Sequence, residues 1–315
     1  MQPTGGSAEV QLLRECEKEA ELMGCHPAMG SSVPRTARLL RIWQQYLWTA
    51  RRLSSIAPVS LDIVILGPVR IVQCGQEVGP SRPKLRQLVG LLAVSGPRAV
   101  THQEIADELW NGTRDMDHAH ACQTHIWNLR KVLAADARAL EHVAGVGYRL
   151  DRTAVQVDAD ALVDLAGHTE EQVRAEAYGE VAQGLSTALD LVDAIPLADL
   201  PLGPVLRPHQ VRLRTLGGQI LGHYLRALLA LGDLRAVVAE TDRVLRRSHS
   251  ADDLYASIIT ARARLGRQAE AIELFHEVRT RTFEQFGIGP GRIVVEALEE
   301  AMAQPTRRTG RLAER

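Results

Sequence analysis

The sequence predicts a mainly α protein with a small β component, organised as two domains. Its 315 residues exceed the usual size of one domain, because most domains contain about 100–200 residues. Only 4% of the residues are aromatic, whereas Ala and Leu are abundant, and this favours helices over a β-sandwich. A hydrophobic content of 45% and a charged content of 24% are ordinary globular values, which exclude disordered, collagen-like and coiled-coil classes.

The net charge of −1, taken alone, argues against a nucleic-acid partner. Charge varies along the chain, since residues 22–59 contain five arginines and no acid, whereas residues 60–151 contain ten basic and ten acidic side chains. No domain is basic overall. A nucleic-acid-binding surface therefore has to come from the arrangement of charges and not from their total.

The cysteine pattern and the hydropathy indicate the cellular compartment in which the protein is expected. The four cysteines lie far apart and form no C-x-x-C pair, so neither a disulfide framework nor a zinc site is expected. We find no secretory segment and no apolar run of membrane-spanning length in the sequence. We expect a cytoplasmic protein that does not contact a membrane.

Residues 1–59 are expected to form a partly helical N-terminal extension. A breaker-rich stretch at 24–34 separates two helices, and the second, over about 35–53, has apolar side chains at intervals of three and four. We favour a helix that packs on the following domain, with a partner-binding or anionic-surface helix as the alternative.

The pattern changes at Ser60, where three short strands are expected. They cover residues 61–66, 69–73 and 76–79, and are separated by Gly-Pro and Cys-Gly turns. Pro83 then stands at the first position of a helix that runs to Val94 and is ended by a Gly-Pro pair.

Two further helices and a hairpin complete this region. Thr101 and Glu104 have the spacing of a capping box, which opens a helix that ends near Trp110. A third helix, capped by Asp115 or Asp117, is expected to run to about residue 133, and residues 142–150 carry a β-hairpin signal. The order of three strands, three helices and a hairpin predicts a winged helix-turn-helix domain with a β-sheet in front.

The third helix of this series has one apolar and one polar face. Its apolar stripe consists of residues at positions i, i+4, i+7 and i+11, namely Cys122, Ile126, Leu129 and Leu133. The opposite face presents side chains suited to a DNA major groove, with Arg130 at the flank: Gln123, Thr124, Trp127, Asn128 and Lys131. Gln and Asn pair with adenine, Thr or an aromatic ring contacts a thymine methyl, and Arg or Lys binds phosphate or guanine. A solvated amphipathic helix is the alternative.

Basic residues also stand at the start of the first helix. We expect at least one of Arg82, Lys84 and Arg86 to clamp a phosphate, with a solvated helix end as the alternative. In the hairpin, Tyr148 either contacts phosphate through its hydroxyl or packs the hairpin on the core.

From about residue 157 to 304 the pattern is helical. The glycines of Ala230–Asp233 and Arg264–Arg267 lie 34 residues apart, which is the tetratricopeptide period. A degenerate earlier copy is suggested near Ala177–Glu180, and an Arg-rich, flexible tail is expected at 305–315.

Several motifs together resemble the Streptomyces antibiotic regulatory protein (SARP) family, over about residues 60–304. The motifs are residues 66–69, 84–89, 108–110, 129–133 and 143–150 in the first domain, and 266–271 and 286–290 in the second. The resemblance implies an OmpR-type winged-helix DNA-binding domain at 60–151 and a bacterial transcriptional activation domain, tetratricopeptide-like, at 157–304. The chain departs from the family at Ala144, where a basic residue is usual, and at 191–196, which lack the usual tryptophan motif.

Metal-dependent and enzymatic functions are not supported. On a helix, His118, Cys122 and His125 share the apolar face while His120 points elsewhere, so we expect no metal. His125 is a candidate for making binding sensitive to pH. No catalytic motif occurs, and we expect neither an enzyme nor a cofactor.

The resemblance implies a transcriptional activator that regulates a specialised-metabolite (antibiotic) gene cluster. It would bind double-stranded promoter DNA at direct repeats as two protomers, a homodimer on DNA, and recruit RNA polymerase, with the loop at 111–116 as a candidate polymerase contact. The alternative is a tetratricopeptide-like interaction scaffold whose winged domain does not bind DNA.

Overall fold

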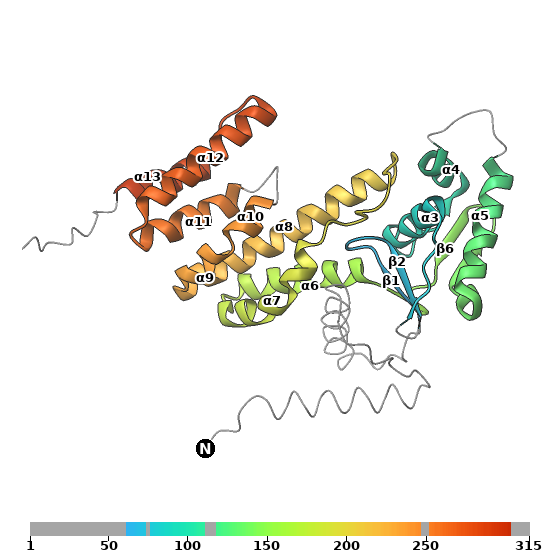
Figure 1. The fold of residues 1–315 in the computed structure, drawn as a ribbon. Coiled ribbons are helices and arrows are strands. Elements are labelled where there is room, and N and C mark those ends of the chain that lie inside the picture. Colours follow the sequence, from blue (N-terminus) through green and yellow to red (C-terminus); the bar gives the residue numbers. More distant parts are fainter. Residues whose placement is uncertain (1–60, 74–75, 111–117, 247–251, 304–315) are drawn as a thin grey trace, which may run out of the picture. The chain divides into compact units, whose positions relative to one another are not determined.

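The structure, a computed structural model, describes residues 61–73, 76–110, 118–246 and 252–303 (Figure 1). They fall into two compact units. The first comprises the described residues up to Asp160 together with Pro196–His209, and the second comprises Ala161–Ile195 and the described residues from Gln210 onwards. The predicted N-terminal helices, the 111–116 loop and the tail lie outside the described residues, and the domain limits of 60–151 and 157–304 remain predictions. The mainly helical fold with a small β component is confirmed.

The first unit begins with a four-stranded sheet in the order β3-β2-β1-β7. Its strands are β1 (Leu61–Val64), β2 (Arg70–Gln73), β3 (Gln76–Glu77) and β7 (Val155–Val157). The first three are antiparallel neighbours, as the short turns between them require, whereas β7 pairs with β1 in parallel. The three predicted strands are therefore confirmed, and β7 was not predicted.

A second sheet, in the order β4-β6-β5, forms the wing. β5 (Leu140–Val143) and β6 (Gly147–Leu150) form the predicted hairpin, and β4 (Val100–Thr101), which was not predicted, pairs with β6. Gly147 is required at this contact, because a Cβ there would lie 1.9 Å from the Val100 carbonyl oxygen.

Three helices that contact one another pairwise form the core of the first unit: α3 (Pro83–Val94), α4 (His102–Trp110) and α5 (His118–Leu133), followed by the 3-10 helix η1 (Ala134–Ala139). α3 buries eight of its twelve residues, which makes it the central helix of the unit. The capping box of α4 is confirmed, because Thr101 Oγ1 accepts from the Glu104 amide at 3.1 Å and Glu104 Oε2 accepts from the Thr101 amide at 2.9 Å.

A segment distant in sequence, Pro196–His209, completes the first unit. The amide of Leu197 donates to the Ile65 carbonyl at 2.8 Å, and the side chain of Gln87 donates to the Pro201 carbonyl at 2.6 Å. A Cβ on Gly90 would lie 3.1 Å from the Leu197 side chain, so the glycine lets this segment pack closely on α3. We refer to Pro196–His209 as the strap.

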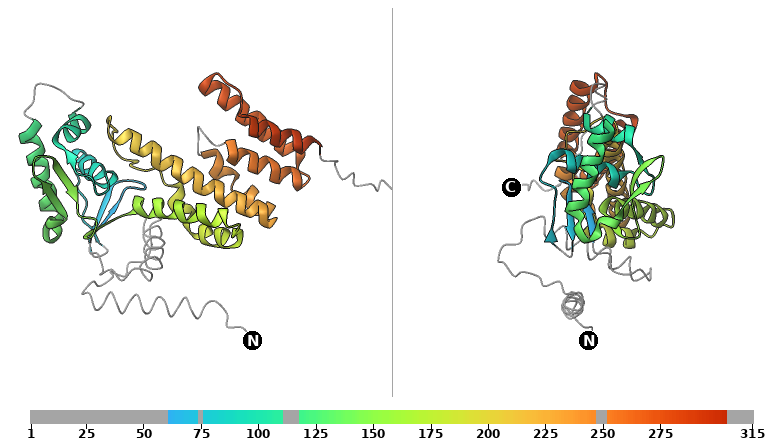
Figure 2. Two further views of the ribbon diagram at one scale, coloured as in Figure 1. Left: turned by 180° about the vertical axis from the view of Figure 1, so that it is seen from behind. Right: turned by 90° about the vertical axis from the view of Figure 1, so that its right-hand side faces the viewer.

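The second unit contains only helices among its described residues (Figure 2). They are α6 (Asp158–Arg174) from Ala161 onwards, α7 (Tyr178–Asp193), α8 (Leu206–Leu231) from Gln210 onwards, α9 (Leu234–Ala239), α10 (Thr241–Arg246), α11 (Asp252–Arg264), α12 (Gln268–Phe286) and α13 (Arg292–Ala303). α11, α12 and α13 contact one another pairwise. Within this described part, no helix is long and apolar enough to cross a membrane, and the same holds for the first unit.

The two predicted repeat turns share one geometry. Gly232 and Gly266 both adopt the left-handed conformation, with φ of 75° and 77°. In each turn the next residue donates back five positions, Asp233 to the Leu228 carbonyl and Arg267 to the Arg262 carbonyl.

The weaker copy between α6 and α7 has the same turn, but its left-handed residue is Glu176, with φ of 56°. Ala177 donates to the Gln172 carbonyl, again five positions back. A turn of this kind is therefore present near the predicted copy, but its left-handed residue lies three positions before Gly179, which is within α7.

Candidate nucleic-acid interface

Helix α5 buries the predicted apolar stripe. Cys122, Ile126, Leu129 and Leu133 are each at most 2% exposed. Complete burial of aliphatic side chains of this size contributes about 1.5–3 kcal/mol each, so the stripe fixes which face of α5 turns outward.

The outward face of α5 carries the side chains that we predicted for base and phosphate contacts. Gln123, Thr124, Trp127 and Lys131 are exposed. Trp127 is 56% exposed, and the Lys131 ammonium lies 3.5 Å from the centre of its indole ring. This cation–π contact places a positive charge and a large apolar surface together on the outer face.

The other two predicted residues of α5 lie at the margin of this face. Asn128 is half-buried. Arg130 is also half-buried, and its guanidinium donates to the Leu140 carbonyl at 3.2 Å. Because Leu140 is the first residue of β5, Arg130 connects α5 to the wing.

Basic side chains also gather at the start of α3. Arg82 and Lys84 are exposed, and no side chain caps the helix at Arg82. The Lys84 ammonium lies 4.8 Å from the Trp110 ring centre, and the His125 ring lies 5.5 Å from the same indole. Partial burial, together with the charges of Lys84 and Arg82, lowers the pKa of His125 below its usual value. The imidazole is therefore neutral at neutral pH, and a bound anion would raise its pKa.

Trp110 was not predicted as a member of this cluster. It joins Lys84 of α3 to His125 of α5, two residues 41 positions apart in the sequence. No local sequence pattern predicts such a contact, because the contact depends on how α3, α4 and α5 pack.

Two of the predicted residues have partners within the protein. Arg86 Nε lies 3.0 Å from Asp199 Oδ2 of the strap. Tyr148 is 7% exposed, and its ring lies between those of His102 and His142 at 5.5 and 5.1 Å. Their contacts with DNA remain predictions from the sequence.

The tip of the wing is exposed but carries no cation. Ala144 and Val146 are both exposed, and Gly145 adopts a φ of 73°. On β6, the exposed Arg149 forms an ion pair of 2.6 Å with Glu141 on β5.

Cys122 is a buried thiol. Burial raises its pKa to about 11, and its Sγ lies 3.9 Å from the His102 carbonyl oxygen. His120 is exposed on the outer side of α5. Among the described residues, no group of three His, Cys, Asp or Glu side chains has an arrangement that would hold a metal ion.

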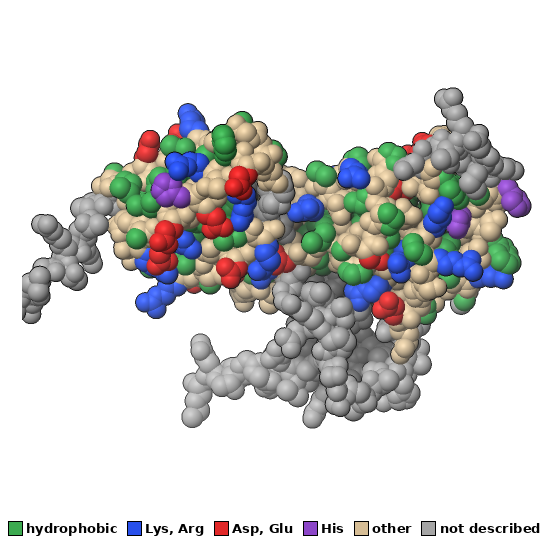
Figure 3. Space-filling model, turned by 45° about the horizontal axis from the view of Figure 1, so that its top comes forward, with side chains coloured by type: hydrophobic (Ala, Val, Ile, Leu, Met, Phe, Trp, Pro, Cys, Tyr) green, Lys and Arg blue, Asp and Glu red, His purple; other side chains and the backbone are tan. Residues whose placement is uncertain are grey.

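Charge is mixed on the face that Figure 3 draws. On the face drawn in Figure 3, Lys and Arg side chains stand singly or in small groups among acidic and uncharged ones. Positive charge on this face is therefore interrupted by side chains of other kinds.

Two domain families match the chain. The family described as "Transcriptional regulatory protein, C terminal" matches residues 76–150, and the family described as "Bacterial transcriptional activator domain" matches residues 157–302.

Curated relatives share both regions. The chain is 26% identical to the transcriptional regulator RedD of Streptomyces coelicolor, over 96% of this chain and 93% of RedD. It is 30% identical to the regulatory protein AfsR of the same organism, over 78% of this chain but only 24% of AfsR.

A solved structure is also similar. Mycobacterium tuberculosis EmbR, in complex with a low-affinity phosphopeptide, superposes with a TM-score of 0.68 at 25% identity. The match covers 79% of this chain and 66% of the EmbR chain.

Proposed function

Since this chain belongs to the Streptomyces antibiotic regulatory protein (SARP) family of transcriptional activators, we propose that its first unit binds promoter DNA through α5 and the wing. The observation that carries the proposal is the outer face of α5, where Gln123, Thr124, Trp127 and Lys131 are exposed opposite a completely buried stripe. A helix of this width fits the major groove of B-DNA.

The candidate contacts divide by chemistry. Amide and hydroxyl side chains on α5, with Trp127, would read base edges and thymine methyl groups. Arg82 and Lys84 at the uncapped start of α3, and Lys131 on α5, would bind phosphates and set the register of the protein on the duplex. Arg86, Arg130 and Tyr148 would act mainly by supporting these groups, because each has a protein partner.

The proposal extends to the biological role. Two protomers would bind a direct repeat near a promoter in the cytoplasm, and would recruit RNA polymerase to a specialised-metabolite gene cluster. Sequence similarity to RedD and AfsR supports this assignment. The role requires no catalytic step, and we assign none.

A mobility-shift titration with promoter DNA and with a scrambled duplex tests the proposal. We expect Asn128→Ala to change the ranking of operator variants, because loss of a bidentate base contact costs about 1–3 kcal/mol of discrimination at one base pair. We expect Lys84→Ala to weaken binding to all duplexes alike.

Two results would contradict this assignment. If Asn128→Ala reduces the affinity for every duplex equally, Asn128 does not contact a base edge. Failure of the unaltered chain to bind any promoter fragment from its own gene neighbourhood would favour the interaction scaffold over the DNA-binding activator.

A further inference from the structure

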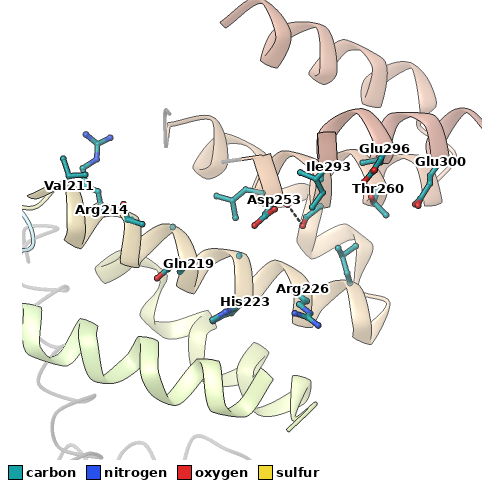
Figure 4. Close-up of a pocket in the computed structure, with 18 residues that line it drawn as sticks. Val211, Arg214, Gln219, His223, Arg226, Asp253, Thr260, Ile293, Glu296 and Glu300 are labelled. Atoms are coloured by element: carbon teal, nitrogen blue, oxygen red, sulfur yellow. Dashed lines mark hydrogen bonds between the residues drawn. The ribbon is translucent and has the colours of Figure 1, made fainter. Parts of the chain in front are cut away.

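The second unit contains a groove of about 970 Å³ that does not take part in the proposed DNA contacts (Figure 4). It is lined by α8, α11 and α13. Its titratable residues differ in charge from one helix to another. α8 contributes two arginines and a histidine, Arg214, Arg226 and His223. α11 and α13 contribute only acids, Asp253, Glu296 and Glu300. The groove therefore has one positive and one negative side.

Two glycines of α8, Gly218 and Gly222, line the same groove. Each glycine inside a helix costs about 1 kcal/mol relative to alanine. Packing within the protein does not explain them: a Cβ at Gly218 would meet nothing within 4 Å, and one at Gly222 would lie at an ordinary 3.5 Å from the Leu254 side chain. Their missing side chains leave room for another backbone to approach α8 closely.

The length of the groove fits a short peptide segment. Its α8 residues extend from Val211 to Leu229. At the helical rise this span is about 27 Å, which corresponds to about eight residues of extended chain. Exposed Ile293 (44%) adds apolar surface to the α13 side.

We propose that this groove binds an extended segment of a partner protein in which acidic and basic side chains alternate. In an extended chain successive side chains point to opposite sides. Acidic residues would then face Arg214 and Arg226, basic residues would face Glu296 and Glu300, and the backbone would pass over Gly218 and Gly222.

The ion pair that Glu296 already forms does not oppose such a ligand. Glu296 forms an ion pair of 3.2 Å with Arg292, one turn earlier on α13, and the side chains are 50% and 89% exposed. Exposed pairs of this kind contribute little, so Glu296 can exchange this partner for a basic side chain of the ligand at small cost.

The test uses the full chain and two fluorescein-labelled peptides of eight residues, one that alternates Glu and Lys and one that carries four Glu followed by four Lys. An all-basic peptide of eight Lys residues, labelled in the same way, is the third probe. Fluorescence anisotropy at low salt measures binding. We expect the alternating peptide to bind at least about tenfold more tightly, because both peptides have the same composition and only one matches both sides of the groove.

Variants locate the binding. Gly218→Leu fills the groove and is expected to reduce affinity at least about tenfold, whereas Gly184→Leu on α7, where a Cβ also meets nothing within 4 Å, is the matched control. Glu296→Lys combined with Glu300→Lys is expected to abolish the preference for the alternating peptide, and Glu299→Lys, an exposed α13 residue that does not line the groove, is its control. The thermal unfolding midpoint of each variant checks folding.

Three outcomes would overturn the proposal. They are equal binding of the two peptides, binding that Gly218→Leu leaves unchanged in a folded protein, and stronger binding of an all-basic peptide than of the alternating one. The last outcome would point to an Arg-rich occupant such as residues 305–315 of this chain.

Discussion

At the scale of single residues, Asp158 has an unusual position for a carboxylate. It is 2% exposed at the first position of α6, and its two oxygens accept from the amides of Ile65 and Leu66, both at 2.8 Å. Burial raises its pKa to about 7, against the effect of these hydrogen bonds, which favour the charged form. The side chain thus holds the end of β1 to the start of α6 while it retains a proton over an unusually wide pH range.

This pKa predicts how stability depends on pH. An unfolded Asp has a pKa of about 3.9, so between about pH 4 and pH 7 the folded chain binds a proton that the unfolded chain releases. The contribution is fully present below about pH 4 and is lost as pH rises through 7. We expect urea unfolding to show that the unaltered chain loses more stability between pH 5 and pH 8 than the Asp158→Asn variant does.

The asparagine variant also serves as an internal comparison. Its amide nitrogen cannot accept a hydrogen bond, so one of the two buried amides is left without an acceptor and stability falls by about 1–3 kcal/mol. An equal loss of stability with rising pH in the variant and in the unaltered chain would show that Asp158 titrates in the ordinary range.

At the scale of elements, the strap is anchored by one side chain of α4. The Glu108 carboxylate, 3% exposed, accepts from the amides of Gly203, Val205 and Leu206 at 2.7–2.9 Å. These amides stand at the N-terminus of α8, where no carbonyl of the same helix is available to them.

We expect Glu108→Gln to lower the free energy of unfolding by about 1–3 kcal/mol, because the amide loses the charge and accepts through only one atom. Gly203→Ala is expected to have a similar effect, since its Cβ would lie 2.8 Å from the carboxylate. The double variant should cost less than the sum of the two, because both disrupt one contact. Urea unfolding measures all three, with Glu141→Gln, part of an exposed ion pair, as the control. Strict additivity would show that Gly203 and Glu108 act separately.

The elements divide clearly into those that local sequence predicts and those that it does not. The limits of α3 follow from Pro83 and the Gly96-Pro97 pair, and the capping box opens α4 within one residue of its predicted start. β4 and β7 have two and three residues and exist only because they pair with β6 and β1. The strap is held by partners about 100 residues away in the sequence. Because the sequence does not show this contact, Glu108 resembles an ordinary solvated acid there.

The candidate site shows the same division. The outward face of α5 follows from the spacing of its apolar stripe, and its exposed members are the residues that this spacing predicts. Trp110 beneath Lys84, and Asp199 beside Arg86, come from other elements and carry no signal at helical spacing. Which cations remain available to a ligand is therefore a property of the tertiary structure.

At the scale of the whole molecule, the number of cations available to a ligand matters more for DNA binding than the near-zero net charge does. The first unit has no excess of positive charge. Of the basic side chains on α3, α5 and β6, Arg86 and Arg149 have carboxylate partners and Arg130 binds a backbone carbonyl. Arg82, Lys84 and Lys131 are exposed on or beside the proposed interface. Non-specific attraction to DNA is therefore expected to be weak, and specific binding to depend on few contacts.

The salt dependence of DNA binding measures how many cations of the protein contact phosphates. Each phosphate neutralised on B-DNA contributes about −0.9 to the slope of log K against log salt concentration, so three cations predict a slope of about −3 for each protomer. Lys84→Ala is expected to make the slope shallower by about 1, whereas Gln123→Ala, which removes no charge, is expected to leave it unchanged. Mobility-shift titrations between 50 and 200 mM salt, about the range over which such slopes are determined, provide the measurement. A slope near −6 for each protomer would mean that Arg86, Arg130 and Arg149 leave their protein partners for phosphates, and that DNA rearranges the first unit as it binds.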